Sequence, residues 1–210
     1  MNIIFQGDSA TDSGRDRSCY NDLGEGYPNY AAAMIQDCFA GDCDFDFYNF
    51  AYEGNSIRDL NDSLNDDFIE IKPDIVSVMI GVDDILSSEY ITRREYRTLL
   101  EEYIRSVKDV GAAVMVIQPY IQDVCDLSED ELEKYKAVRE ITELVAAKYA
   151  DAYLPLPPKH IRLPEDNDDE DELYDDGGEE LMLSDDVSYI VGELYLEAIT
   201  PIIENIIAQE

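Results

Sequence analysis

The feature that most constrains the fold of this chain is a regular alternation of short apolar runs with longer stretches of helical periodicity. Five runs read as buried strands, because each is short, nearly continuous in apolar residues and bounded by turn residues. Amphipathic stretches with capping signals separate them and read as helices. The predicted strands are Asn2–Gln6, Asp44–Ala51, Asp74–Ile80, Ala113–Gln118 and Ala152–Leu156, and the predicted helices are Pro28–Cys38, Ile57–Asp66, Thr92–Val110, Ser128–Lys148 and Val187–Ala208, the last interrupted or kinked at Pro201.

This order predicts a parallel sheet with helices on both faces, a three-layer α/β/α sandwich. We expect one domain over residues 1–210. Parallel strands present their carboxyl ends at one edge of a sheet, and ligands of such folds bind there. The loops after Gln6, Ala51, Ile80, Gln118 and Leu156 are therefore expected to meet at the same edge.

The net charge excludes several classes of partner. The 210 residues include 15 Lys+Arg and 49 Asp+Glu, which gives −34 at pH 7. A surface this acidic repels nucleic-acid phosphates and anionic membranes, so we expect neither as a partner. No apolar run approaches the roughly 18 residues of a membrane span, and no targeting segment is recognisable. We therefore expect a cytoplasmic location.

The acidic residues are densest in the low-complexity segment 165–180, which holds 11 acids and no base. We interpret this segment as a solvated, mobile excursion at the carboxyl edge of the sheet. A cation-binding lid is the alternative, although the segment lacks the glycine of the calcium-loop template. Outside it, acids still outnumber bases by more than two to one.

The cysteines and tyrosines have ordinary structural interpretations. The four cysteines form no CxxC pair and have no nearby histidine, so we expect free thiols and neither a metal site nor a cofactor. Fifteen tyrosines without a tryptophan could form a sugar-binding platform, but Tyr96 and Tyr103 have the spacing of a helix core, which favours packing. The cysteines are Cys19, Cys38, Cys43 and Cys125.

Glycine-containing turns follow the first three predicted strands, at Gly7-Asp8-Ser9, at Gly54 and at 81–84 (GVDD). A serine in a tight turn between strand and helix can present its hydroxyl and its own N–H to a substrate carbonyl. Glycine allows a backbone N–H to approach a ligand closely. Taken alone, Gly-Asp-Ser is more often an ordinary turn.

Together these segments resemble the SGNH/GDSL hydrolase family. Residues 7–15 (GDSATDSGR) resemble its first block, Gly54 lies where the glycine of the second block is expected, and 81–84 is similar to the third block, Gly-x-Asn-Asp. Residues 21–27 (NDLGEGY) are similar to a bacterial subgroup. The resemblance covers residues 2 to 155 and implies a flavodoxin-like sandwich that hydrolyses esters. It implies Ser9 as the nucleophile and the N–H groups of Ser9 and Gly54 as oxyanion donors.

Two departures from the family pattern affect the chemistry. Asp83 stands at the position of the family's asparagine, the third oxyanion donor, and an ionised carboxylate accepts where an amide donates. The family's Asp-x-x-His block is best matched by Asp185 to Ser188, so serine replaces the general base. An alternative register based on Gly192 puts Val187 at that position. Without a base, Ser9 is a poor nucleophile.

The only histidine, His160, follows the last predicted strand and should therefore emerge at the same edge as Ser9. It could serve as a relocated base, although a histidine in a proline-rich loop is more often a surface residue.

Two functions remain open. One is an ester hydrolase, an acyl esterase or lipase-like acylhydrolase, with weak activity on a small-molecule ester or acylated carbohydrate. The other is an inactive pseudoenzyme that serves as a binding or interaction module. The uncompensated carboxylates at the shared edge also predict weak binding of a divalent cation. These carboxylates are Asp8, Asp83, Asp84, Asp185 and Asp186.

Overall fold

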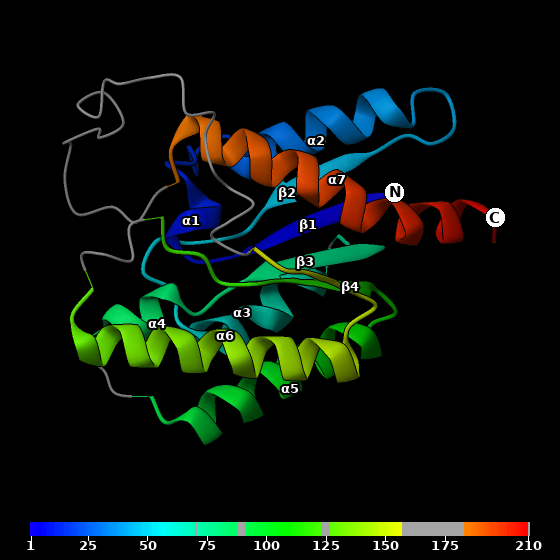
Figure 1. Cartoon of the computed structure of the whole chain (residues 1–210). Helices are drawn as coiled ribbons and strands as arrows, with labels where there is room; N and C mark the ends of the chain where they lie inside the picture. The colour runs from blue at the N-terminus through cyan, green and yellow to red at the C-terminus, as the bar shows by residue number, and fades with distance from the viewer. Residues whose placement is uncertain (70, 88–90, 123–126, 157–182, 210) are drawn as a thin grey trace.

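The computed structural model describes residues 1–69, 71–87, 91–122, 127–156 and 183–209 (Figure 1). Within these residues five parallel strands form one sheet in the order β2-β1-β3-β4-β5. The predicted sandwich with a five-stranded parallel sheet is therefore confirmed. Its elements are β1 (Asn2–Gly7), α1 (Ser9–Asp12), α2 (Tyr27–Cys38), β2 (Asp46–Asn49), α3 (Ile57–Ile69), β3 (Ile75–Met79), α4 (Val82–Leu86), α5 (Arg93–Asp109), β4 (Ala113–Ile117), α6 (Glu129–Tyr149), β5 (Ala152–Leu154) and α7 (Asp185–Ile207).

Helices cover both faces of the sheet. α2 and α7 lie on one face, and α3, α5 and α6 lie on the other (Figure 1). Alternate residues of β1 point to the two faces of the sheet. Phe5 packs with Tyr27 and Tyr195 under α2 and α7, while Ile4 packs into the apolar core under α3, α5 and α6. Burial of this apolar surface is the main favourable term in folding. Tyr96 and Tyr103 are fully buried, in agreement with the packing role expected from their spacing.

The observed elements differ from the predicted ones mainly at their ends. β2 is shorter than predicted, because this edge strand pairs with β1 only from Asp46 to Asn49. α7 begins two residues earlier than predicted, since the side chain of Ser184 accepts a hydrogen bond from the Val187 N–H and caps the helix. The helix then continues through Pro201 without a restart.

Two short helices that the sequence did not predict, α1 and α4, follow β1 and β3 directly. Helices of four and five residues are too short to produce a recognisable period. Both lie at the carboxyl edge of the sheet, where the site was expected (Figure 1).

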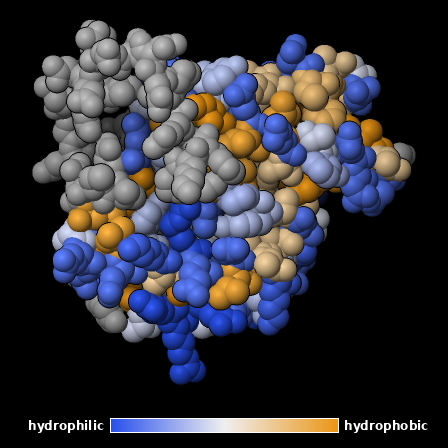
Figure 2. Space-filling model, in the orientation of Figure 1, coloured by the Kyte–Doolittle hydropathy of each residue, from blue (hydrophilic) through white to orange (hydrophobic). Residues whose placement is uncertain are grey.

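Several features expected from the sequence can be located only in part. The segment 165–180, His160 and Cys125 lie outside the described residues. Cys19, Cys38 and Cys43 are free thiols. None of the described helices combines the length and the apolar character needed to cross a membrane. Over α6, the face in Figure 2 is largely hydrophilic.

Candidate active site

The register between β1 and β3 brings the two glycine turns of the site together. Gly7 pairs with Met79, so the residues after each strand run side by side. A Cβ at residue 7 would lie 2.3 Å from the carbonyl oxygen of Met79, which explains why glycine is required there. α1 then starts at Ser9 and α4 at Val82.

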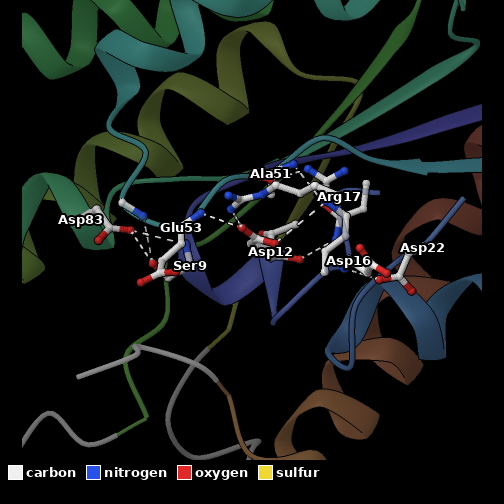
Figure 3. A network of polar contacts seen from close by, with 12 residues as sticks. Ser9, Asp12, Asp16, Arg17, Asp22, Ala51, Glu53 and Asp83 are labelled. Atoms are coloured by element: carbon white, nitrogen blue, oxygen red, sulfur yellow. Dashed lines mark hydrogen bonds and ion pairs between the residues drawn. The ribbon is translucent and has the colours of Figure 1, made fainter. Parts of the chain in front are cut away.

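The Ser9 hydroxyl donates one hydrogen bond and accepts another. Its Oγ–H donates to Asp83 Oδ2 at 3.1 Å, and the Gly54 N–H donates to Oγ at 3.2 Å (Figure 3). The backbone N–H of Ser9 also points at Asp83 Oδ2, at 3.4 Å. Gly54 has φ of +79°, a conformation that glycine adopts without strain. The structure thus brings together Ser9, Gly54 and Asp83, three of the predicted site residues.

Asp8 fixes the position of α4 relative to β1. Its Oδ2 accepts hydrogen bonds from the N–H groups of Gly81 and Val82, each at 3.1 Å. The side chain is fully buried, and burial, followed by the charge of Asp83, raises the pKa of Asp8 to about 8. Much of the Asp8 population is therefore neutral near pH 7.

Asp83 and Asp84 point in different directions from the start of α4. Burial raises the pKa of Asp83, although the hydrogen bonds from Ser9 act in the opposite direction. Asp84 accepts a hydrogen bond from the Ile57 N–H at 3.0 Å and anchors the start of α3. Burial raises the pKa of Asp84 to about 7. Of the two neighbouring carboxyls, only Asp83 faces Ser9.

A cavity of about 210 Å³ opens beside Ser9. Asp12 accepts hydrogen bonds from the Arg17 guanidinium and from the Glu53 N–H, and these contacts form one wall (Figure 3). Arg15 and Arg17 stack on the ring of Tyr52. The cavity is lined by Ser9, Asp12, Ser13, Gly14, Arg15, Arg17 and Glu53.

Two arginines that were not predicted as site residues line this wall. Acids were expected at the edge that holds Ser9, and the cavity lining carries two acids and two arginines. Asp12 and Arg15 lie within residues 7–15, the segment that resembles the first family block. Their opposite charges, three residues apart, were the sequence signal that could have indicated an ion pair at the site.

The two residues of the last block, Asp185 and Ser188, hydrogen-bond to partners other than Ser9. Asp185 is exposed in the first turn of α7 and accepts a hydrogen bond from the hydroxyl of Tyr30. Ser188 is completely buried, and its hydroxyl donates to the Leu183 carbonyl at 3.5 Å. No hydrogen bond within the described residues joins either of them to Ser9.

Metal ligands are not gathered at this edge within the described part of the chain. No group of three His, Cys, Asp or Glu side chains there could hold a metal ion. Asp8 hydrogen-bonds to the start of α4, Asp84 to the start of α3 and Asp185 to Tyr30 on α2, so each of these acids is held by a partner of its own.

A five-stranded parallel sheet with a serine at the turn after β1, faced by turns after β2 and β3, defines an α/β protein of the hydrolase type. The chain belongs to the GDSL-like lipase/acylhydrolase family, whose model matches residues 5–188.

Individual relatives agree with this assignment. An acetylxylan esterase from Geobacillus stearothermophilus is 27% identical over 164 residues, which cover 71% of this chain and 74% of the esterase. A solved acetylxylan esterase from the same organism aligns with a TM-score of 0.73 at 20% identity, over 93% of this chain and 92% of that one. An alpha/beta hydrolase enzyme from the metagenome of Lake Arreo, Spain, aligns with a TM-score of 0.76 at 19% identity, over 96% and 95%.

Solved mutants of the same esterase bear on the last block. Mutants described as catalytic replace a serine, an aspartate, or a histidine three positions after that aspartate with alanine. The same spacing in this chain runs from Asp185 to Ser188.

Proposed function

We propose that this protein is a slow ester hydrolase that removes small acyl groups from carbohydrates or other small alcohols. The observation that carries the proposal is the arrangement of the Ser9 hydroxyl between the Gly54 N–H and the Asp83 carboxylate. Membership of an acylhydrolase family and similarity to an acetylxylan esterase support the substrate class. The small cavity beside Ser9 suits a short acyl group.

In this reaction the Ser9 hydroxyl attacks the ester carbonyl and forms an acyl-enzyme, which water then hydrolyses. The N–H groups of Ser9 and Gly54, which donate to Asp83 and to Ser9 Oγ in this structure, would turn to the oxyanion as it forms. Turnover is expected to be slow, because Ser188 stands where the family has its histidine and Asp83 where it has an amide donor. Loss of one oxyanion donor alone costs about 10²–10³ in kcat in another serine hydrolase.

Labelling of Ser9 tests this proposal. An organophosphonate probe followed by mass spectrometry should modify Ser9, and hydrolysis of p-nitrophenyl acetate should disappear in Ser9→Ala. Ser56→Ala, which removes a half-buried serine near the same edge, is the control and should keep both properties. An unlabelled Ser9 in a folded protein would contradict the proposal.

A binding module without turnover is the second candidate. It is favoured by Asp83, whose carboxylate accepts the Ser9 N–H that a substrate oxyanion would otherwise use. Under this alternative, calorimetry detects binding of an acetylated xylo-oligosaccharide, and no ester is cleaved. Ser9→Ala binds the oligosaccharide as tightly as the wild type does. Calorimetry with Ca²⁺ or Mg²⁺ tests the predicted cation binding in the same samples, and the absence of heat above mixing would exclude it at useful affinity.

A further inference from the structure

We infer that Asp83 is the general base of this site and accepts the Ser9 proton directly, in place of a histidine. The inference rests on the proposed ester hydrolysis and assigns the step that the family pattern leaves without a residue. It also gives Asp83 a role opposite to that of the amide donor whose position it occupies.

The direction of the hydrogen bonds at Ser9 supports this assignment. The Gly54 N–H can only donate, so it uses a lone pair of Oγ and leaves the hydroxyl proton for the other partner. That partner is Asp83 Oδ2, at 3.1 Å. Within the described residues no other side chain makes a hydrogen bond with this hydroxyl. A general base must lie within hydrogen-bond reach of the proton it removes, and Asp83 does.

The backbone around Asp83 holds the carboxylate in place. Asp8 accepts the N–H groups of Gly81 and Val82, the two residues immediately before Asp83. Asp84, the residue after it, is bound to the Ile57 N–H. Both flanking anchors are buried, so Asp83 is presented to Ser9 by a rigid turn.

The surroundings of Asp83 favour its acting as a base. Burial raises its pKa, which increases the basicity of the carboxylate. Within the described residues, three acidic groups interact with it: Asp8 after β1, Asp84 on α4 and Glu53 from the loop after β2. The negative charge of Glu53 favours protonation of Asp83, whereas much of the Asp8 population is neutral near pH 7.

Direct transfer also removes the electrostatic objection to a carboxylate in this position. As the proton moves from Ser9 Oγ to Asp83 Oδ2, Oγ bonds to the ester carbon and the negative charge moves to the carbonyl oxygen. Asp83 is then neutral, so the oxyanion does not face a second negative charge. The net charge of the site is unchanged throughout.

The remaining steps pass the Ser9 proton to the alcohol and restore Ser9 with a proton from water. When the oxyanion collapses, the bond from carbon to the alcohol oxygen breaks, and Asp83 gives its proton to the leaving alcohol. In deacylation, Asp83 accepts a proton from water, whose oxygen attacks the acyl carbon. The bond to Ser9 Oγ breaks, and Asp83 reprotonates Ser9. The products are one alcohol and one carboxylic acid, and no oxidant or cofactor is consumed.

Replacing Asp83 gives opposite results if Asp83 is the general base and if its carboxylate only obstructs the oxyanion donors. Asp83→Asn restores the amide of the family pattern but removes the proton acceptor. If Asp83 is the base, p-nitrophenyl acetate hydrolysis and phosphonate labelling of Ser9 should both fall by about 10²–10⁴. If its carboxylate only obstructs the oxyanion donors, both should rise, which would overturn the inference.

Matched variants separate this chemistry from structural damage. Asp46→Asn removes an exposed carboxyl at the start of β2, at the opposite edge of the sheet, so its rate should stay within a few-fold of wild type. In Asp83→Ala, added formate should restore part of the rate in proportion to its concentration, which a purely structural role does not predict. No rescue, with the variant folded, would count against the base.

The dependence on pH identifies the group that titrates. The wild-type kcat/KM should rise with pH as Asp83 ionises, and His160→Ala should show the same rise. If the rise is lost in His160→Ala but kept in Asp83→Asn, His160 is the base and the inference is overturned. A wild type that neither labels nor hydrolyses rejects the proposed function itself. An active wild type matched by Asp83→Asn rejects only the role of Asp83.

Discussion

Asp8 shows how one buried carboxyl links the pH dependence of stability to the geometry of the site. In the folded protein its pKa is about 8, against 3.8 for an unperturbed aspartate. The folded state therefore holds a proton that the unfolded state has lost. Asp8 contributes stability that is fully present below about pH 4 and is lost as the pH rises toward 8.

Asp8→Asn should remove this pH dependence while keeping an acceptor for Gly81 and Val82. The difference in free energy of unfolding between wild type and variant should change by up to about 1.4 kcal/mol per pH unit within that window. Denaturant unfolding at several pH values measures it. Asp46→Asn, an exposed carboxyl at the start of β2, is the control and should give a curve parallel to that of the wild type.

At the scale of elements, the contact between α2 and α7 depends on Gly192. A Cβ at this position would lie 2.8 Å from the Cβ of Tyr30 and 3.3 Å from the backbone nitrogen of Ala31. Neither atom is the end of a flexible chain, so the helices would have to separate. Overpacking of this kind costs about 1–3 kcal/mol, more than the ~1 kcal/mol of helix propensity that alanine gains over glycine.

Gly192→Ala should therefore lower the free energy of unfolding by about 1 kcal/mol, as measured by urea denaturation. The exposed neighbour Glu193 provides the control, because Glu193→Ala changes the same helix without touching α2. Equal or greater stability of Gly192→Ala would mean that α2 adjusts without cost.

The elements also mark the limit of what the sequence could predict. The alternation of apolar runs and amphipathic stretches was sufficient for the parallel sheet, and the glycine turns were sufficient to place Ser9 and Gly54 at one edge. The contact of Ser9 with Asp83 depends on β1 pairing with β3, and no pattern within a single strand encodes that neighbour. The burial of Ser188 likewise depends on how α7 packs onto the sheet, which local sequence does not specify.

At the scale of the whole molecule, a net charge of −34 opposes compaction. Ion pairs such as Arg97–Glu101 and Lys108–Asp151 offset only a small part of this repulsion, since they are at the surface. Raising the ionic strength from about 0.01 M to 1 M shortens the Debye length from about 30 Å to 3 Å and weakens the repulsion.

The melting temperature should therefore rise with added NaCl. A gain of about 1 kcal/mol corresponds to roughly 2–4 °C for a chain of this size. Differential scanning calorimetry across the salt series measures the shift, and the rise should be smaller at pH 4.5, where fewer carboxyls are ionised. A melting temperature that does not change with salt would show that repulsion does not limit stability.

The direction of the strands has a practical consequence for handling the protein. β1 starts at Asn2 and runs toward Ser9, while α7 starts at the edge that holds the site and runs back (Figure 1). Both ends of the chain therefore lie at the edge opposite the site. An affinity tag, a fluorophore or a solid support attached at either end leaves the approach to Ser9 free, so immobilised protein and free protein should react with the same probes.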